Sequence, residues 1–262
     1  MIDCHVHIER GPYDLDWLKK FIAQGQQAGL SEIYILEHTH RFREFLPLYF
    51  PMSQYNSYQY HWLQRKGEHS VYEYIQLIEL AKKQCYPITV KFGLEVCYDE
   101  AMEDFIEKIK QTYNWDFFTG AVHWVDGFAY DHKKAFWIGK NINAIYRRYY
   151  DLILKAIKSN LFTILAHPDA IKCFDFYPDI KLEDTYYRIA QQLNIHNMYA
   201  EESAGLHNNY SHRELGLNYE MRKIFIENNV AVLTGSDAHK PEDVGKGIIH
   251  LEKIMEETNE II

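Results

Sequence analysis

Residues 230–239 read VAVLTGSDAH, a short apolar and β-branched run that ends in a carboxylate and an imidazole. A run of this length and composition, bounded by turn residues, is typical of a buried strand. Six similar runs predict further strands at residues 1–7, 32–38, 89–96, 117–124, 162–169 and 197–203. Most of these runs also carry histidine or glutamate at or near the carboxyl end, so residues suited to metal binding follow the strands.

Helical patterns lie between the predicted strands. Residues 14–30 begin with aspartate, continue with apolar residues at helical spacing and have a glycine near the end. Similar patterns occupy residues 71–85, 99–113, 142–160, 182–194 and 219–229. This alternation favours parallel βα units that close, or nearly close, into a barrel. We expect a single α/β domain over residues 1–262, with an irregular loop or lid around residues 40–70 and a long connection at 126–141.

The composition indicates a globular protein and restricts its partners. The chain has 262 residues, of which 47% are hydrophobic, and a formal net charge of −9. General nucleic-acid binding is not expected, because it requires clustered basic residues. We find neither a signal peptide nor an apolar run near the ~18 residues that a membrane span needs, so we expect no membrane association and a cytoplasmic location. The oligomeric state is left open.

The cysteines predict neither a disulfide framework nor a zinc ribbon. The chain has four cysteines, and no two of them have CxxC spacing. We interpret them as reduced thiols in or near the core. They are Cys4, Cys85, Cys97 and Cys173.

The residues suited to metal binding are expected at one face, because the carboxyl ends of parallel barrel strands converge. His5 and His7 are two apart on one strand and can point the same way toward one ion. Imidazole and carboxylate together suit Zn, Mn or Fe. Six histidines and two carboxylates exceed one tetrahedral site, so two or three divalent metal ions are predicted. The full set is His5, His7, His38, Glu95, His123, His167, Asp237 and His239.

The ordered motifs resemble those of the polymerase and histidinol phosphatase (PHP) superfamily, from residue 3 to about residue 247. They are HVH at 5–7, EH at 37–38, GLE at 93–95, VH at 122–123, AHPD at 166–169 and GSDAHKPEDVG at 235–245. The resemblance implies a distorted seven-stranded βα barrel whose trinuclear metal centre hydrolyses phosphate esters.

The resemblance also distributes the ligands over three metals. It places the first metal on His5, His7, Glu95 and Asp237, the second on Glu95, His123 and His167, and the third on His38 and His239. Many family members carry another histidine where this chain has Tyr13, and Glu9 or His40 could substitute for it.

Two stretches resemble the histidinol phosphatase branch, namely AVHWVDG at 121–127 and GSDAHKPEDVG at 235–245. L-histidinol phosphate is therefore the expected small phosphorylated substrate. The stretch after the sixth strand departs from that branch, with Glu202 in place of asparagine and His207 near an expected arginine. A PHP-type protein-tyrosine phosphatase or another small-molecule phosphoesterase is the alternative, ahead of a noncatalytic metal-bound module or an amidohydrolase.

The expected mechanism is attack on phosphorus by metal-bridging hydroxide, because a metal lowers the pKa of its water to around 7. A planar guanidinium matches phosphate oxygens, and Arg147 is the first candidate, with Arg148 and Arg213 as alternatives. Asp237 and His239 are the candidate catalytic residues that give a proton to the departing alcohol.

Overall fold

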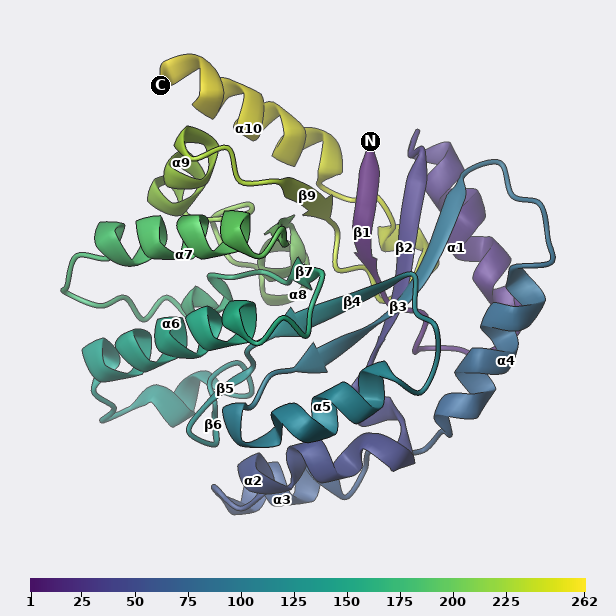
Figure 1. Ribbon diagram of the computed structural model, residues 1–262, viewed down its shortest axis with the longest axis horizontal. Coiled ribbons are helices and arrows are strands. Elements are labelled where there is room, and N and C mark those ends of the chain that lie inside the picture. The colour runs from purple at the N-terminus through teal and green to yellow at the C-terminus, as the bar shows by residue number, and fades with distance from the viewer.

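The computed structural model describes residues 1–262 and contains one sheet of seven parallel strands surrounded by helices (Figure 1). The strands of this sheet are β1 Ile2–Val6, β2 Glu32–His38, β3 Thr89–Cys97, β4 Phe117–Ala121, β7 Ile164–Leu165, β8 Tyr199–Ser203 and β9 Val232–Gly235. The predicted seven-stranded α/β barrel is therefore confirmed. Strands β7 and β9 are shorter than predicted, because the backbone turns to positive φ soon after each of them, at His167 and Asp237.

The strand order is β1-β2-β3-β4-β7-β8-β9, and every neighbouring pair is parallel. His38 at the end of β2 lies opposite Glu95 of β3. The chain beyond β9 also meets β1, since Val6 forms a bridge with Ala238 and the backbone N–H of His7 donates to the Ala238 carbonyl at 2.8 Å. The sheet is thus a nearly closed barrel, and the carboxyl ends of its strands share one face.

The predicted helices form between the strands. They are α1 Leu15–Gln27, α4 Val71–Ala81, α5 Glu103–Lys110, α6 Ile142–Lys158, α7 Glu183–Ile195 and α9 Tyr219–Glu227. The Asp14 side chain caps α1 by accepting the backbone N–H of Trp17 at 2.7 Å, as its position predicts. Two further helices, α8 Gly205–Tyr210 and α10 Ile248–Ile261, are not predicted. Helix α10 follows Gly247 in the left-handed region without a side-chain cap, so the usual start signal is missing.

The segment at residues 40–70 is helical rather than irregular. It contains the 3₁₀ helices η1 Thr39–Arg41 and η2 Arg43–Tyr49, and the short helices α2 Phe50–Ser53 and α3 Ser57–Leu63. Pro47 lies inside η2, and Pro51 occupies the first turn of α2, where a missing N–H costs little. These turns are too short to show a helical period in the sequence, which explains why they were not predicted. Tyr49, Met52 and Trp62 of this segment line the main cavity.

A β-hairpin begins the long connection at residues 126–141. Strands β5 Trp124–Val125 and β6 Phe128–Ala129 are antiparallel and are joined by Asp126 and Gly127. Both turn residues have positive φ, 48° and 83°, as a tight Asp-Gly hairpin turn requires. The hairpin brings the next residues to the cavity before the 3₁₀ helix η4 Lys134–Trp137 begins.

An irregularity in β1 aims its histidines at the barrel interior. Cys4 packs inside the barrel, in a small cluster of apolar side chains. Val6 packs on the opposite face of the strand, in the large apolar core between the sheet and the helices. The register of β1 against β2 shifts between Asp3 and Val6. Bulges of this kind re-aim side chains near active sites. The shift lets His5 follow Cys4 toward the interior instead of pointing outward.

Candidate metal centre

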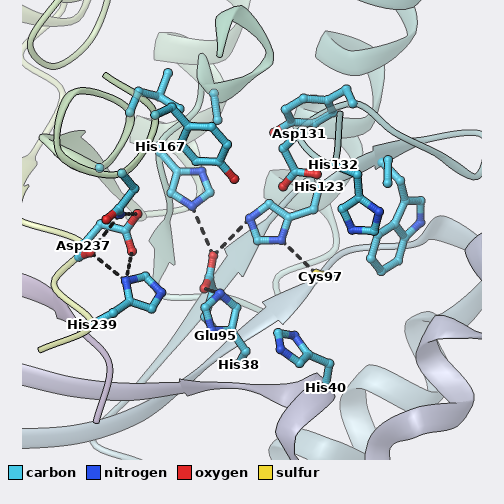
Figure 2. Close-up of a pocket in the computed structure, with 18 of the residues that line it drawn as sticks. His38, His40, Glu95, Cys97, His123, Asp131, His132, His167, Asp237 and His239 are labelled. Atoms are coloured by element: carbon cyan, nitrogen blue, oxygen red, sulfur yellow. Dashed lines mark hydrogen bonds and ion pairs between the residues drawn. The ribbon is translucent and has the colours of Figure 1, made fainter. Parts of the chain in front are cut away.

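A cavity of about 380 Å³ opens at the carboxyl ends of the strands. Figure 2 shows imidazoles and carboxylates from β2, β3 and the loops after β4, β7 and β9 converging on it. The lining residues suited to metal binding are Glu9, His38, His40, Glu95, His123, His167, Asp237 and His239. His5 and His7 lie beneath them and are almost fully buried. The structure therefore brings together all eight predicted ligands.

His5 and His7 face each other at the bottom of the site. Their Nε2 atoms are 3.0 Å apart, as the two-residue spacing predicts. His5 Nδ1 donates to Oε2 of Glu201 at 3.0 Å, and Nε2 on the other side of the ring faces the site. Burial opposes the charged form of His5, but Glu201 and Glu95 raise its pKa well above the usual value. For His7, burial together with the neighbouring histidines lowers the pKa well below it.

Glu95 is the centre of the cluster, because five imidazoles surround its carboxylate. Its Oε1 lies 3.1 Å from His167 Nε2 and 3.4 Å from His123 Nε2, and its Oε2 lies 3.1 Å from His38 Nε2 and 3.5 Å from Nε2 of both His5 and His7. Burial alone would favour the neutral acid. The surrounding imidazoles reverse this effect and hold the pKa of Glu95 well below its usual range. The two oxygens thus face two different sets of ligands, as a bridging carboxylate must.

Two ligand positions have unusual backbone conformations. His167 and Asp237 have φ of 26° and 54°, a region that residues other than glycine rarely occupy. At Asp237 the turn brings Oδ1 to 3.7 Å from His5 Nε2 and 3.6 Å from His7 Nε2. Oδ2 of Asp237 accepts the side-chain N–H of Asn209 at 2.9 Å. Such strain clusters at functional sites, where it is offset by the surrounding structure.

A third group of ligands lies on the other side of His7. The rings of His38 and His239 stack on His7, with centroids 4.0 and 4.6 Å away. Glu9 contacts both, with Oε2 3.5 Å from His38 Nδ1 and Oε1 3.6 Å from His239 Nε2. His40 can join Glu9 and His38 in one metal-binding group.

Tyr13, where the family resemblance led us to expect a further histidine, does not line the cavity. It packs against the rings of Phe42 and Tyr74 instead. Glu9, one of the two expected substitutes, lies near His38 and His239.

The donor atoms fit divalent metal ions. Four groups of three donors each have atoms within 4.8 Å of one another: His5, His7 and Asp237; His5, Glu95 and His167; His7, His38 and His239; and Glu9, His38 and His40. Oε2 of Glu95 is buried without a hydrogen-bond partner. Imidazole nitrogens that face each other, together with an unsatisfied buried carboxylate oxygen, are the arrangement that a cation stabilises.

A family model described as the PHP domain matches residues 3–204. The chain belongs to the PHP family. A second model, described as PHP-associated, matches residues 217–262 of this PHP protein.

Relatives of this PHP protein share its fold over nearly their whole length. A curated protein of Deinococcus radiodurans, described as a probable histidinol-phosphatase, is 24% identical over 94% of this chain and 88% of its own. The histidinol phosphate phosphatase of Lactococcus lactis, crystallised with zinc, L-histidinol and phosphate, aligns with a TM-score of 0.69 and 19% identity over 96% of this chain and 92% of its own. A structure from Listeria monocytogenes, assigned as a histidinol phosphatase, has a TM-score of 0.73 and 17% identity over 95% and 99%.

Sequence reasoning missed the residues that orient the ligands of this PHP site. Glu201 of β8 accepts both from His5 and from the backbone N–H of His167, at 3.0 Å each. Cys97 lies 3.0 Å from His123 Nδ1 and was interpreted only as a core thiol. The two-residue period of a strand could have identified Cys97, because it follows Glu95 by two residues and therefore lies on the same face of β3.

The structure does not bring the three predicted phosphate-binding arginines into the cavity of this PHP protein. Arg147 is exposed, and Arg148 forms ion pairs with Glu100, Asp126 and Asp151 on the outer surface. Arg213 lies over the ring of Tyr177, 5.8 Å from its centroid. The basic residues that line the cavity are Arg10 and Lys66.

The departures after the sixth strand lie outside the cavity as well. Glu202 forms a buried ion pair with Arg222, with Oε1 2.9 Å from Nη2, and also accepts the backbone N–H of Leu217 at 2.8 Å. His207 Nδ1 donates to the carbonyl of His212 at 2.9 Å. Neither Glu202 nor His207 lines the cavity, so these two differences do not alter its walls.

Proposed function

We propose that this chain hydrolyses L-histidinol phosphate to L-histidinol and phosphate in a metal-dependent reaction. The observation that carries the proposal is the position of Glu95, whose two carboxylate oxygens lie among five imidazoles at the mouth of a PHP barrel. The zinc, L-histidinol and phosphate bound by the Lactococcus lactis protein support the choice of substrate and metal. A small substrate also suits the acidic chain better than nucleic acid does, and we place the reaction in the cytoplasm.

We propose two to three ions of Zn, Mn or Fe as cofactors. The first would be held by His5, His7, Glu95 and Asp237, the second by Glu95, His123 and His167, and the third by His38 and His239 with Glu9. Such ions lower the pKa of a bound water and offset the charge of the phosphate. The chain has no helix long and apolar enough to cross a membrane.

The chain itself would orient the ester and move the proton. Arg10 and Lys66, at the rim of the cavity, are placed to attract the phosphate dianion as it enters. Asp237 is proposed to take a proton from the attacking water and give it to the leaving alcohol, with His239 as the alternative. His239 Nδ1 lies 2.9 Å from the Asp237 carbonyl and donates to it, which directs Nε2 toward Glu9 and the cavity.

Phosphate release from a panel of monoesters tests this function on protein whose metals have been counted by elemental analysis. The panel contains L-histidinol phosphate, p-nitrophenyl phosphate and a phosphotyrosine peptide. We expect L-histidinol phosphate to have the highest kcat/KM, with two to three metals per chain. A higher value for the phosphotyrosine peptide would reject the proposed substrate and favour the protein phosphatase.

Two variants test the roles of the metal-site carboxylates. Glu95→Gln is expected to lose metal and activity together, because it removes the negative charge that five imidazoles surround. Asp237→Asn is expected to lower kcat more than it weakens inhibition by phosphate. The reverse pattern for Asp237→Asn would remove Asp237 from proton transfer and leave it as a ligand only.

A further inference from the structure

Asp131 and His132 lie on the wall of the cavity and are not used by the metal centre. They follow the β5–β6 hairpin, and both side chains line the cavity (Figure 2). Neither belongs to any group of donors close enough to hold a metal ion. Figure 2 shows both side chains on the side of the cavity that also holds His123, opposite Asp237 and His239.

The carboxylate of Asp131 has no cationic partner in the protein. No lysine, arginine or histidine forms an ion pair with it, and burial raises its pKa, the direction expected for a carboxyl without a cationic partner. Its Oδ1 is buried without a hydrogen-bond partner. An unpaired carboxylate in a cavity wall can bind a cationic group of a ligand that enters the cavity.

His132 supplies a second unsatisfied group beside Asp131. Its Nδ1 is buried without a partner, and its ring packs against Trp62 with centroids 5.0 Å apart. Burial, assisted by the charge of Lys66, lowers the pKa of His132 to about 4, so this imidazole is neutral near pH 7. A neutral imidazole next to an indole offers one hydrogen bond and flat apolar surface to a heteroaromatic ring.

We propose that Asp131 binds an ammonium group on the alcohol part of the substrate, and that His132 and Trp62 bind its planar ring. This inference rests on the proposed phosphatase function and assigns the residues that would recognise the alcohol part of its substrate. The phosphate faces the metal ligands, and the ammonium faces the unpaired carboxylate. The two charges of the substrate are thereby matched at separate parts of one cavity.

Asp131→Asn tests the ammonium contact in metal-loaded protein. The substrates are L-histidinol phosphate and its desamino analogue, 3-(imidazol-4-yl)propyl phosphate. The parent protein is expected to prefer the amine by about 100-fold in kcat/KM, because a buried polar group is left unpaired when the analogue binds. In the variant, kcat/KM for the amine falls by a similar factor, mainly through KM, while the value for the analogue changes less than about threefold.

Two results would overturn the proposal. One is an equal loss on both esters, which would give Asp131 a role in the chemistry or in folding instead. The other is a parent protein that does not discriminate between the two esters. Asp16→Asn, at an exposed position far from the cavity, is the matched control, and an unchanged melting temperature establishes that Asp131→Asn folds.

A separate experiment distinguishes failure of the ammonium proposal from failure of the proposed function. If the parent protein hydrolyses p-nitrophenyl phosphate but neither imidazole ester, the assigned reaction is rejected. O-phosphoethanolamine and ethyl phosphate then form the test pair. A preference for the amine that Asp131→Asn abolishes supports the ammonium site, and absence of that preference overturns it.

The ring contact has its own variant. His132→Ala is expected to raise KM for both imidazole esters by about tenfold, because both carry the ring, and to leave the ratio between them unchanged. A change confined to the amine would contradict the division of roles between Asp131 and His132.

Discussion

His5 of β1 and Glu201 of β8 meet inside the barrel, with Nδ1 of the imidazole 3.0 Å from Oε2 of the carboxylate. The same oxygen accepts the backbone N–H of His167 at 3.0 Å. The buried carboxylate of Glu201 therefore holds both the imidazole of His5 on β1 and the backbone turn at His167 after β7. Metal-binding histidines are commonly oriented by such a partner, which also makes the other ring nitrogen a better ligand.

Glu201→Gln is expected to weaken metal binding by about 10- to 100-fold, the usual effect of removing a carboxylate that orients a ligand histidine. The amide keeps the shape of the side chain but loses its charge, so the fold should persist. Metal content after dialysis against a competing chelator measures the effect. Glu242→Gln, at an exposed position, is the control. Equal metal retention in both variants would show that Glu201 does not tune the site.

Cys97→Ala is expected to lower the affinity of the metal held by His123 by about tenfold. With Nε2 of His123 left to bind the metal, Nδ1 carries the proton and donates to the Cys97 sulfur at 3.0 Å; burial keeps the pKa of this thiol well above its usual value, so the acceptor is a neutral thiol. Cys97→Ser should retain most of the affinity, because a hydroxyl accepts the same hydrogen bond. Zinc titration of the two variants, with the exposed Cys85→Ser as control, checks the order. Identical titrations for alanine and serine would contradict it.

The convergence of the candidate ligands could be predicted from the sequence because each lies at or just after the end of a short apolar run, where parallel strands converge. His38 and Glu95 illustrate this, since they lie opposite each other in neighbouring strands. The bulge that aims His5 inward and the positive φ that aims His167 have no recognisable sequence pattern. The sequence predicted only that both side chains reach the site.

The basic residues of the cavity, which we propose attract the phosphate, could not be predicted in this way. Arg148 has a guanidinium at a plausible place in the chain, but three carboxylates hold it on the outer surface. Arg10 and Lys66 reach the cavity from loops whose direction depends on packing of the segment at 40–70. Order along a chain predicts the ends of strands better than it predicts the path of a loop.

Glu44→Gln is expected to cost about 1 kcal/mol of the free energy of unfolding near pH 7, the usual size of a hydrogen-bonded negative charge at a helix N-terminus. Its carboxylate joins η2 to the start of α4 by accepting from Ser70 Oγ at 2.6 Å and from the Val71 N–H at 3.0 Å. Burial opposes the charge of Glu44, but these two donors lower its pKa below the usual 4.5.

The pH dependence of this variant follows from the direction of that shift. Because the folded pKa is lowered, the contribution is present above pH 4.5 and is lost as the pH falls through the folded value. Urea midpoints of the parent and of Glu44→Gln should therefore differ at neutral pH and converge in acid. Glu256→Gln, an exposed change on α10, is the control. A difference between the two urea midpoints that persists in acid would show that the charge of Glu44 is not its source.

Arg222→Met is expected to destabilise the fold by about 3–5 kcal/mol, because it leaves the carboxylate of Glu202 buried without its partner. Arg222 also donates to the Leu217 carbonyl at 2.6 Å, so its loss removes a link between α9 and the loop before it. Glu202 does not line the cavity, and kcat per folded molecule should be unchanged. Chemical denaturation measures the loss, with the exposed Arg188→Met as control.

The double variant Glu202→Gln with Arg222→Met should recover part of the stability, because the buried charge is then gone. Equal stability of the single and double variants would contradict an unpaired charge as the cause.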